Sequence, residues 1–288
     1  MRIDAHLHFW SPASGFDNRP IADNAAYRRD FLPEHVRPDL DACGIDGVVL
    51  VQTCPQAEET EWLLRLETNE PRVLGVTAWI DLDRPGHDLM ALATDRRIVG
   101  IRAQLRRIED PDFIRRPHVI TNLAGALRAG LNVTILAEPR HYVAVSAVLN
   151  TLPDGPITLN HLGLPFPDVD REAWRAFMGT FAARPNGFVQ LSGLPFLYGE
   201  GWRAPAVLRL MDEALDLLGP ERLMFASDWP MLLRFATYSE WMDTVLEFLE
   251  RRDLPQADRE AILAGNACRA NPRLEAALPT TVCEGEPR

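Results

Sequence analysis

The segment Ile3-Asp4-Ala5-His6-Leu7-His8 opens the chain with a short, largely apolar run that ends in two histidines one residue apart. Seven further short apolar runs follow, at 47–52, 73–80, 98–104, 131–137, 157–161, 188–193 and 223–228. Runs of this length are typical of parallel strands that are buried on both faces. Helix-like segments alternate with them, most clearly at 57–70, 118–128, 140–149, 171–183, 205–218 and 238–251. This alternation predicts an α/β fold, a single (β/α)8 TIM barrel.

Two segments lie outside this repeating pattern. Residues 9–31 form a long first connection rich in Asn, Asp, Pro and Ser, and loops of this length over a barrel mouth often act as lids. A terminal helix is expected over 256–267, so we assign 1–278 to the barrel and 279–288 to a polar tail. An open doubly wound sheet is the competing fold, but no G-x-G-x-x-G turn follows the first strand.

Composition narrows the classes of partner. The 288 residues carry a net charge of -11, which would repel nucleic acid and anionic membranes, and no apolar run approaches the roughly 18 residues of a membrane span. All 30 basic residues are arginine and none is lysine. Pyridoxal phosphate enzymes, lysine aldolases and P-loop NTPases depend on a lysine, so these classes are excluded. We therefore expect a small-molecule substrate, and the sequence leaves open whether the protein forms a homo-oligomer.

The cysteines indicate the compartment. Cys43, Cys54, Cys268 and Cys283 show no C-x-x-C spacing, and the chain begins without a secretory signal. We expect reduced thiols in a cytoplasmic protein, with Cys43 and Cys54 packed as small apolar side chains.

The residues at the ends of three strands could carry chemistry. Strand alternation would point His6 and His8, together with Asp4, into the barrel lumen. His161 ends the sixth strand and Asp228 ends the eighth, and active sites of such barrels lie at this end of the strands. Histidines in a core and an aspartate that begins a turn are the structural alternatives. Together the four side chains predict metal-assisted hydrolysis, or direct polarisation of a carbonyl by the histidines.

Four motifs, in the right order along nearly the whole chain, resemble the amidohydrolase superfamily. They are H-x-H-x-W at 6–10, N-H-L-G-L-P at 160–165, L-S-G-L at 191–194 and S-D-W-P at 227–230. More narrowly, they resemble its lactonase branch of sugar-lactone, 2-pyrone-4,6-dicarboxylate and sulfomuconolactone hydrolases. The resemblance implies that the catalytic and metal-binding set is His6, His8, His161 and Asp228, with Asp228 as the general base toward water.

The same resemblance constrains the cofactor. Binuclear members use a carboxylated lysine as a bridging ligand, which this chain lacks, so one divalent ion (zinc or manganese) or a metal-free site is implied. Gln190 stands where many relatives have a lysine, and this difference leaves the role of the position open.

Arginines near the fourth strand suggest how a substrate would be bound. The planar guanidinium of Arg102, at the strand end, could bind a carboxylate bidentately, and Arg106 and Arg107 follow closely. The resemblance to dicarboxylate lactonases also implies that arginines in this region bind substrate carboxylates. The alternative is that they form ordinary surface ion pairs. Glu138 could be a metal ligand, a partner of sugar hydroxyls or a helix cap. Two aromatic residues, Trp10 and Tyr198, could wall a pocket or simply pack.

The predicted function is that of a catabolic hydrolase that opens a small lactone ring by water attack. The nearby arginines favour a carboxylated muconolactone or pyrone slightly over a sugar lactone. The alternative within the superfamily is a metal-dependent nonoxidative decarboxylase of an aromatic or muconate-like acid, which a carbon dioxide assay would distinguish. A barrel kept only as a binding or scaffold protein is the alternative outside enzymology.

Overall fold

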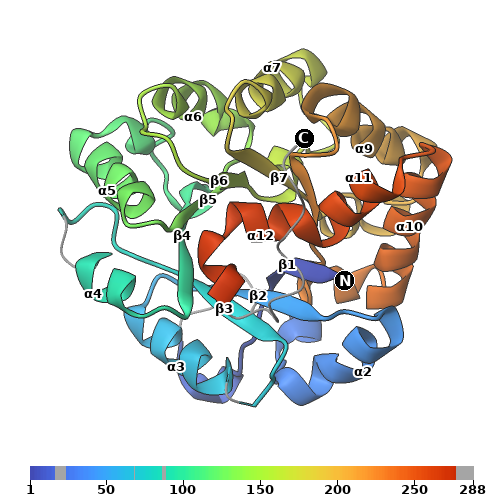
Figure 1. The fold of residues 1–288 in the computed structure, drawn as a ribbon, viewed down its shortest axis with the longest axis horizontal. Helices are drawn as coiled ribbons and strands as arrows, with labels where there is room; N and C mark the ends of the chain where they lie inside the picture. The colour runs from blue at the N-terminus through green and yellow to red at the C-terminus, as the bar shows by residue number, and fades with distance from the viewer. Residues whose placement is uncertain (17–23, 68, 86–88, 277–288) are drawn as a thin grey trace.

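The barrel is built from parallel strands that pair in the order of the sequence. The computed structural model describes residues 1–16, 24–67, 69–85 and 89–276. One sheet contains eight strands: β1 (Ile3–Leu7), β2 (Gly47–Val51), β3 (Val73–Ala78), β4 (Ile98–Gln104), β5 (Asn132–Leu136), β6 (Ile157–Leu159), β7 (Gly187–Leu191) and β8 (Leu223–Phe225). A parallel bridge between Leu7 and Trp229 joins its two ends, and His8 N donates to Trp229 O over 2.8 Å. The prediction of a single TIM barrel is confirmed (Figure 1).

Helices form a ring outside the strands (Figure 1). The structure has α2 (Pro33–Cys43), α3 (Ala57–Glu67), α4 (Leu89–Thr94), α5 (Pro117–Arg128), α6 (Tyr142–Leu149), α7 (Arg171–Ala182), α8 (Leu194–Tyr198), α9 (Pro205–Leu218) and α10 (Tyr238–Arg251). The sequence pattern did not single out α2, α4 or α8. Both α4 and α8 are too short for a clear helical period, and α2 carries an internal proline at Pro38.

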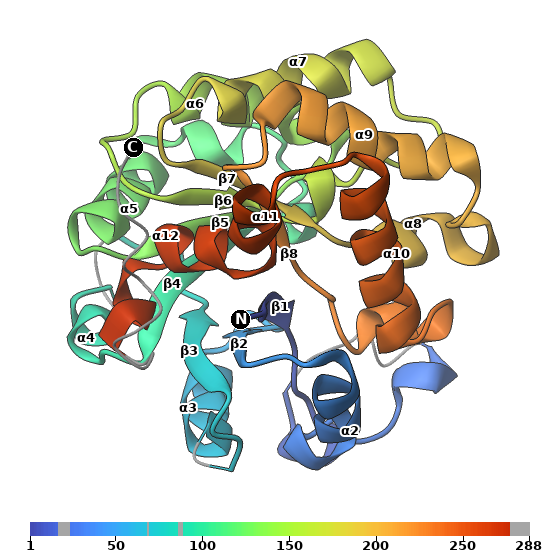
Figure 2. The same ribbon diagram turned by 45° about the vertical axis from the view of Figure 1, so that its right-hand side comes forward.

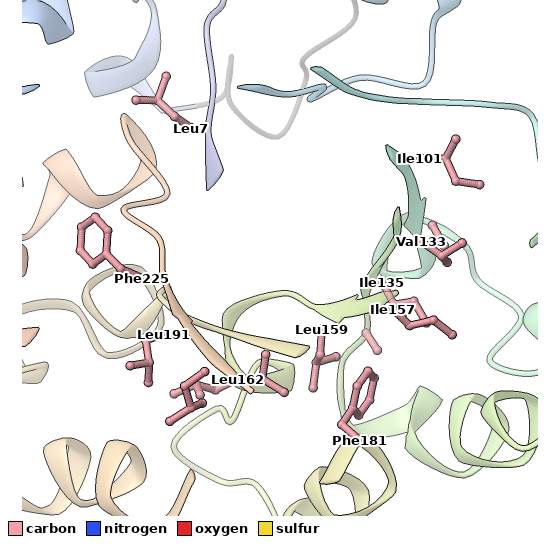
Figure 3. Close-up of a cluster of buried hydrophobic side chains, with 14 of the residues drawn as sticks. Leu7, Ile101, Val133, Ile135, Ile157, Leu159, Leu162, Phe181, Leu191 and Phe225 are labelled. Atoms are coloured by element: carbon pink, nitrogen blue, oxygen red, sulfur yellow. The ribbon is translucent and has the colours of Figure 1, made fainter. Parts of the chain in front are cut away.

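The larger core lies between the strands and this ring of helices. Apolar strand residues such as Leu7, Val133 and Phe225 are fully buried there, and Phe181 of α7 packs into the same cluster (Figure 3). Burying one such side chain contributes about 1.5–3 kcal/mol relative to exposure. This layer therefore holds the strands rigidly enough for their ends to fix the positions of functional side chains.

A second, smaller core closes the amino-terminal end of the barrel. The chain after α10 continues through α11 (Gln256–Glu260), a π-helical turn (Ala261–Gly265) and α12 (Asn266–Ala270). This segment crosses the barrel end (Figures 1 and 2), where Ala267 and Cys268 pack against Ile3, Val99 and Phe188. The expected terminal helix is thus present but interrupted by the π turn. The predicted tail 279–288, with Cys283, lies outside the described residues.

A bulge in β1 changes which side chains enter the lumen. Asp4 pairs with Val48 and Leu7 pairs with Leu50, so β1 uses one residue more than β2 between these pairs. The Asp4 carboxylate consequently meets α10, where Tyr238 Oη donates to it over 2.9 Å. The prediction that Asp4 shares the lumen with the two histidines is wrong, because the bulge interrupts the alternation on which it rested.

The long first connection is anchored at both ends. Trp10 and Phe31 form an antiparallel bridge with backbone hydrogen bonds of 3.0 and 2.9 Å, and Tyr27 Oη donates to Met231 O over 2.6 Å. Its central part, 17–23, lies outside the described residues, so its action as a lid stays a prediction. Within the described part of the chain, none of the helices has the length and apolar character needed to cross a membrane.

Candidate active site

Four polar side chains meet at the carboxyl ends of β1, β6 and β8. Oδ1 of Asp228 lies 3.4 Å from Nε2 of His8, 3.7 Å from Nε2 of His6 and 3.8 Å from Nε2 of His161. All four side chains are buried. The structure therefore brings together the four residues that the sequence nominated, although they are spread over more than two hundred positions of the chain.

The backbone at two of these residues is unusual. His161 and Asp228 adopt the left-handed conformation, with φ of 50° and 60°. Such backbone conformations cost about 1–3 kcal/mol each and cluster at functional sites. Gly193, also left-handed with φ of 81°, packs against His161 so closely that a Cβ there would lie 2.7 Å from His161 Cβ. The chain after β7 thus needs a glycine at 193 to leave room for the imidazole.

The second ring nitrogen of each histidine has a partner that orients the ring. His6 Nδ1 lies 2.9 Å from Gln190 Oε1, His8 Nδ1 lies 2.5 Å from Val51 O, and His161 Nδ1 lies 2.7 Å from Ser192 Oγ. Because Val51 O and Gln190 Oε1 only accept, the Nδ1 atoms of His8 and His6 carry the protons. Their Nε2 lone pairs therefore face Asp228 and each other, with 3.0 Å between the two Nε2 atoms.

This donor set fits one divalent metal ion. A tetrahedral site with metal–ligand distances of about 2.0–2.1 Å has edges of roughly 3.3 Å. Four of the six distances among the donor atoms range from 3.0 to 3.8 Å. His6, His161 and Asp228 form a group whose donor atoms all lie within 4.8 Å of one another, and His8 is not in that group. Two lone pairs that face each other also need a cation or a proton near them. Three imidazoles and a carboxylate are ligands suited to such an ion.

Burial and neighbouring charges together set the protonation states of the site. Burial lowers the pKa of His161 to about 4, partly opposed by Asp228, and burial together with His8 lowers the pKa of His6. Burial alone would raise the pKa of Asp228, but His161, His8 and Arg102 outweigh it and hold this pKa below its usual value. At neutral pH the site thus presents neutral His6 and His161 imidazoles and an ionised Asp228 carboxylate, the forms that bind metal and accept a proton.

A cavity of about 630 Å³ opens over this group. Its size suits a small ligand. It is lined by His8, Thr53, Pro55, Arg102, Gln104, Arg106, Arg107, Leu136, His161, Leu164, Gly193, Phe196, Asp228 and Met231. All three of the predicted arginines are in this wall.

The arginines in the wall differ in how they are held. Arg102 is buried and donates through Nη1 to Gln52 O over 3.0 Å and through Nε to Asn160 Oδ1 over 3.3 Å. Arg106 lies 3.5 Å from the Glu138 carboxylate and beside the rings of Phe166 and Phe196. Part of the positive charge at the cavity is therefore already balanced by Glu138.

Three other residues that the sequence suggested lie elsewhere. Glu138 is not in the cavity wall and pairs with Arg140 over 2.6 Å as well as with Arg106. The Trp10 indole donates to Tyr27 O over 3.1 Å inside the first connection. Tyr198 Oη donates to Pro165 O over 2.6 Å behind the wall. Their side chains have structural partners, so we leave these residues out of the proposed substrate contacts.

Sequence reasoning also missed polar residues that the fold brings to the site. Gln104 and Thr53 line the cavity, and Gln104 Nε2 donates to Thr53 O over 3.0 Å while Gln104 Oε1 is buried without a partner among the described residues. Gln190 in β7, whose role the sequence left open, supports His6, and Ser192, which directly follows β7, supports His161. Their spacing of two was a usable signal, because residues i and i+2 of an extended segment share a face.

The chain also matches a known protein family. Residues 3–270 match the family model described as amidohydrolase. The chain belongs to the amidohydrolase family. The resemblance inferred from the four motifs is thereby confirmed.

This amidohydrolase has relatives that narrow its branch. It is 34% identical over 277 residues to an L-fucono-1,5-lactonase of Burkholderia ambifaria, covering 93% of this chain and 94% of the relative. It is 31% identical to an L-fucono-1,5-lactonase of Burkholderia multivorans, covering 93% and 95% of the two chains. A crystal structure of an amidohydrolase from Burkholderia multivorans with bound zinc is 32% identical, covers 97% and 100%, and has a TM-score of 0.85. These relatives support the lactonase branch and a site for a divalent metal.

Proposed function

We propose that this amidohydrolase opens the ring of a neutral sugar 1,5-lactone by adding water, with Asp228 as the general base. The observation that carries the proposal is the ionised, buried Asp228, which lies in the cavity wall and beside three histidines. The 34% identity to an L-fucono-1,5-lactonase supports the substrate class. The pairing of Arg106 with Glu138 weakens the argument from charge for an acidic lactone.

In the proposed mechanism, Asp228 Oδ1 accepts a proton from a water molecule as its oxygen attacks the lactone carbonyl carbon. The bond from that carbon to the ring oxygen then breaks, and Asp228 returns the proton to the leaving alkoxide. The products are a free hydroxyl and a carboxylic acid, which ionises to solvent. Arg102, buried in the wall, is placed to stabilise the negative charge that develops on the carbonyl oxygen.

We propose zinc as the ion that His6, His8, His161 and Asp228 would hold, because imidazole and carboxylate are its usual ligands and a relative has bound zinc. When bound, zinc supplies Lewis acidity toward a carbonyl oxygen and lowers the pKa of water. Without a metal, the buried guanidinium of Arg102 in the cavity wall would provide the positive charge toward the carbonyl oxygen. The chain's own residues perform the same proton transfers in both cases.

A carboxylated lactone is the second candidate, and one observation favours it. Arg102 makes its hydrogen bonds to neutral acceptors, and within the described ranges its Nη2 atom has no hydrogen-bond partner. A substrate carboxylate could bind that atom. This candidate predicts that activity depends on Arg102 far more with a carboxylated ring than with a neutral one.

A pH-indicator assay of proton release tests the proposal. The panel contains sugar 1,5- and 1,4-lactones, carboxylated muconolactones and pyrones, each with metal-free and zinc-loaded protein. Turnover of a sugar 1,5-lactone supports the proposal, and exclusive turnover of a carboxylated ring replaces it with the second candidate. Release of carbon dioxide from aromatic acids, with no lactone turned over, would overturn both and favour the decarboxylase.

A further inference from the structure

Two buried amide side chains lie on the side of His6 that faces away from Asp228. Gln190 Oε1 is 2.9 Å from His6 Nδ1, and Asn160 Nδ2 is 2.7 Å from the same Gln190 oxygen. Gln190 Nε2 donates to Ala5 O over 3.0 Å. Asn160 and Gln190 are both buried, so water cannot replace these partners.

These contacts fix the direction of the Gln190 amide. Ala5 O can only accept, so it requires the NH2 end of Gln190, and Asn160 Nδ2 can only donate, so it requires the oxygen end. The oxygen therefore faces His6 Nδ1, and a stable contact there requires a proton on Nδ1. A neutral His6 with its proton on Nδ1 keeps the lone pair on Nε2, beside Asp228, where a metal ion would bind.

Asn160 also faces the His6 ring directly. Its Nδ2 atom lies 3.2 Å from His6 Nδ1, so it would donate to that nitrogen if Nδ1 carried no proton. The two amides thus favour opposite tautomers of His6, and the shorter contact to the Gln190 oxygen decides between them. Without that oxygen, the amide of Asn160 would favour a proton on Nε2, which would block the position that binds metal.

The amide pair reaches the cavity through Asn160. Its Oδ1 atom accepts from Arg102 Nε over 3.3 Å, while its Nδ2 atom donates to Gln190. The position of a guanidinium in the cavity wall is therefore tied to the same unit that orients His6.

We propose that Gln190 is a positioning residue that selects the tautomer of His6, and that Asn160 locks it and joins it to Arg102. The proposal deepens the proposed function, since it explains how this site keeps Nε2 available with a neutral amide instead of a carboxylate or a lysine at that position. Its test uses the state of the ring and binding of zinc alone, neither of which depends on lactone turnover.

The experiment records long-range proton–nitrogen spectra of protein labelled with nitrogen-15 in its histidines, first metal-free and then titrated with zinc. We compare the wild type with Gln190→Leu, which removes the acceptor, and Gln190→Glu, which keeps an acceptor oxygen. Gln190→Met serves as a second variant if the leucine variant does not fold. Asn132→Leu is the matched control, because Asn132 is a buried amide whose partners, Thr158 and Asn271, lie outside this unit.

The wild type, the glutamate variant and the control should show His6 with its proton on Nδ1. The leucine variant should move that proton to Nε2 and weaken zinc binding about 10- to 100-fold. An unchanged His6 tautomer together with unchanged zinc affinity in the leucine or methionine variant would overturn the proposal. Equal weakening in Asn132→Leu would also overturn it, because the effect would then be a general loss of packing.

Discussion

The Nε2 atoms of His6 and His8 lie 3.0 Å apart, while the Nδ1 atom of each ring faces an oxygen that can only accept a hydrogen bond. Both rings therefore direct a lone pair into the same small space, beside the Asp228 carboxylate. Such an arrangement is stable only with a positive charge close by, as a metal ion or a proton.

Metal content should be one divalent ion per chain. The described residues offer a single donor set, and the chain has no lysine to bridge a second ion. We expect elemental analysis to give about one zinc per chain after loading, and zinc at 100 times its Kd to stabilise the fold by about 2.7 kcal/mol. His161→Asn should lose this stabilisation, whereas His118→Asn, at a surface histidine paired with Asp83, should retain it. Two tightly bound ions per chain would contradict the mononuclear site.

Replacing Asp228 by Asn should abolish most turnover and leave the fold intact. The amide cannot accept a proton from water, so kcat should fall by about 10²–10⁴-fold. Steady-state kinetics on the best lactone of the panel measures the loss, and thermal unfolding checks that the variant is folded. Activity within a few-fold of the wild type would remove Asp228 from the role of general base.

Gly193→Ala should damage the site more than the fold. The new Cβ would lie 2.7 Å from His161 Cβ, at a left-handed backbone position. We expect displacement of His161, at least a tenfold loss of kcat/KM, and destabilisation of about 1–3 kcal/mol. Gly130→Ala is the matched control, since Gly130 has φ of 73° but a Cβ added there would meet no described atom within 4 Å. Similar kinetic losses in both variants would show that backbone strain alone accounts for the effect.

Asp4 should make stability depend on pH in a characteristic direction. Burial raises its pKa from 3.8 to about 6, so between these values the native state binds more protons than the unfolded state. The contribution of Asp4 to the free energy of unfolding is therefore present in acid and falls by about 2 kcal/mol as pH rises from 4 to 7. Asp4→Asn, which does not titrate, should become more stable relative to the wild type over that range. Chemical denaturation at several pH values measures the difference, and a constant difference would contradict the raised pKa.

The barrel could be predicted from local pattern because its strands and helices are short units with distinct apolar periods. The same pattern gave a wrong prediction for Asp4. A one-residue bulge against β2 changes which face of the sheet the side chains point to, and this bulge is set by the pairing between strands. For Trp10 and Tyr198 the pattern left open whether they line a pocket or pack, and in the structure their polar atoms donate to backbone carbonyls of neighbouring segments. Contacts between residues far apart in the sequence decide where such side chains point, and a short stretch of sequence does not contain both partners.

The sequence by itself determined the fold class and nominated His6, His8, His161 and Asp228, because strand ends of a barrel converge wherever they occur in the chain. Only the tertiary structure decided what surrounds them. It placed Gln190 behind His6, paired Arg106 with Glu138, and set Gly193 against His161. The physical reason is that hydrogen-bond direction, charge balance and close packing depend on distances of a few ångströms between residues remote in sequence, and those distances exist only after the barrel has closed.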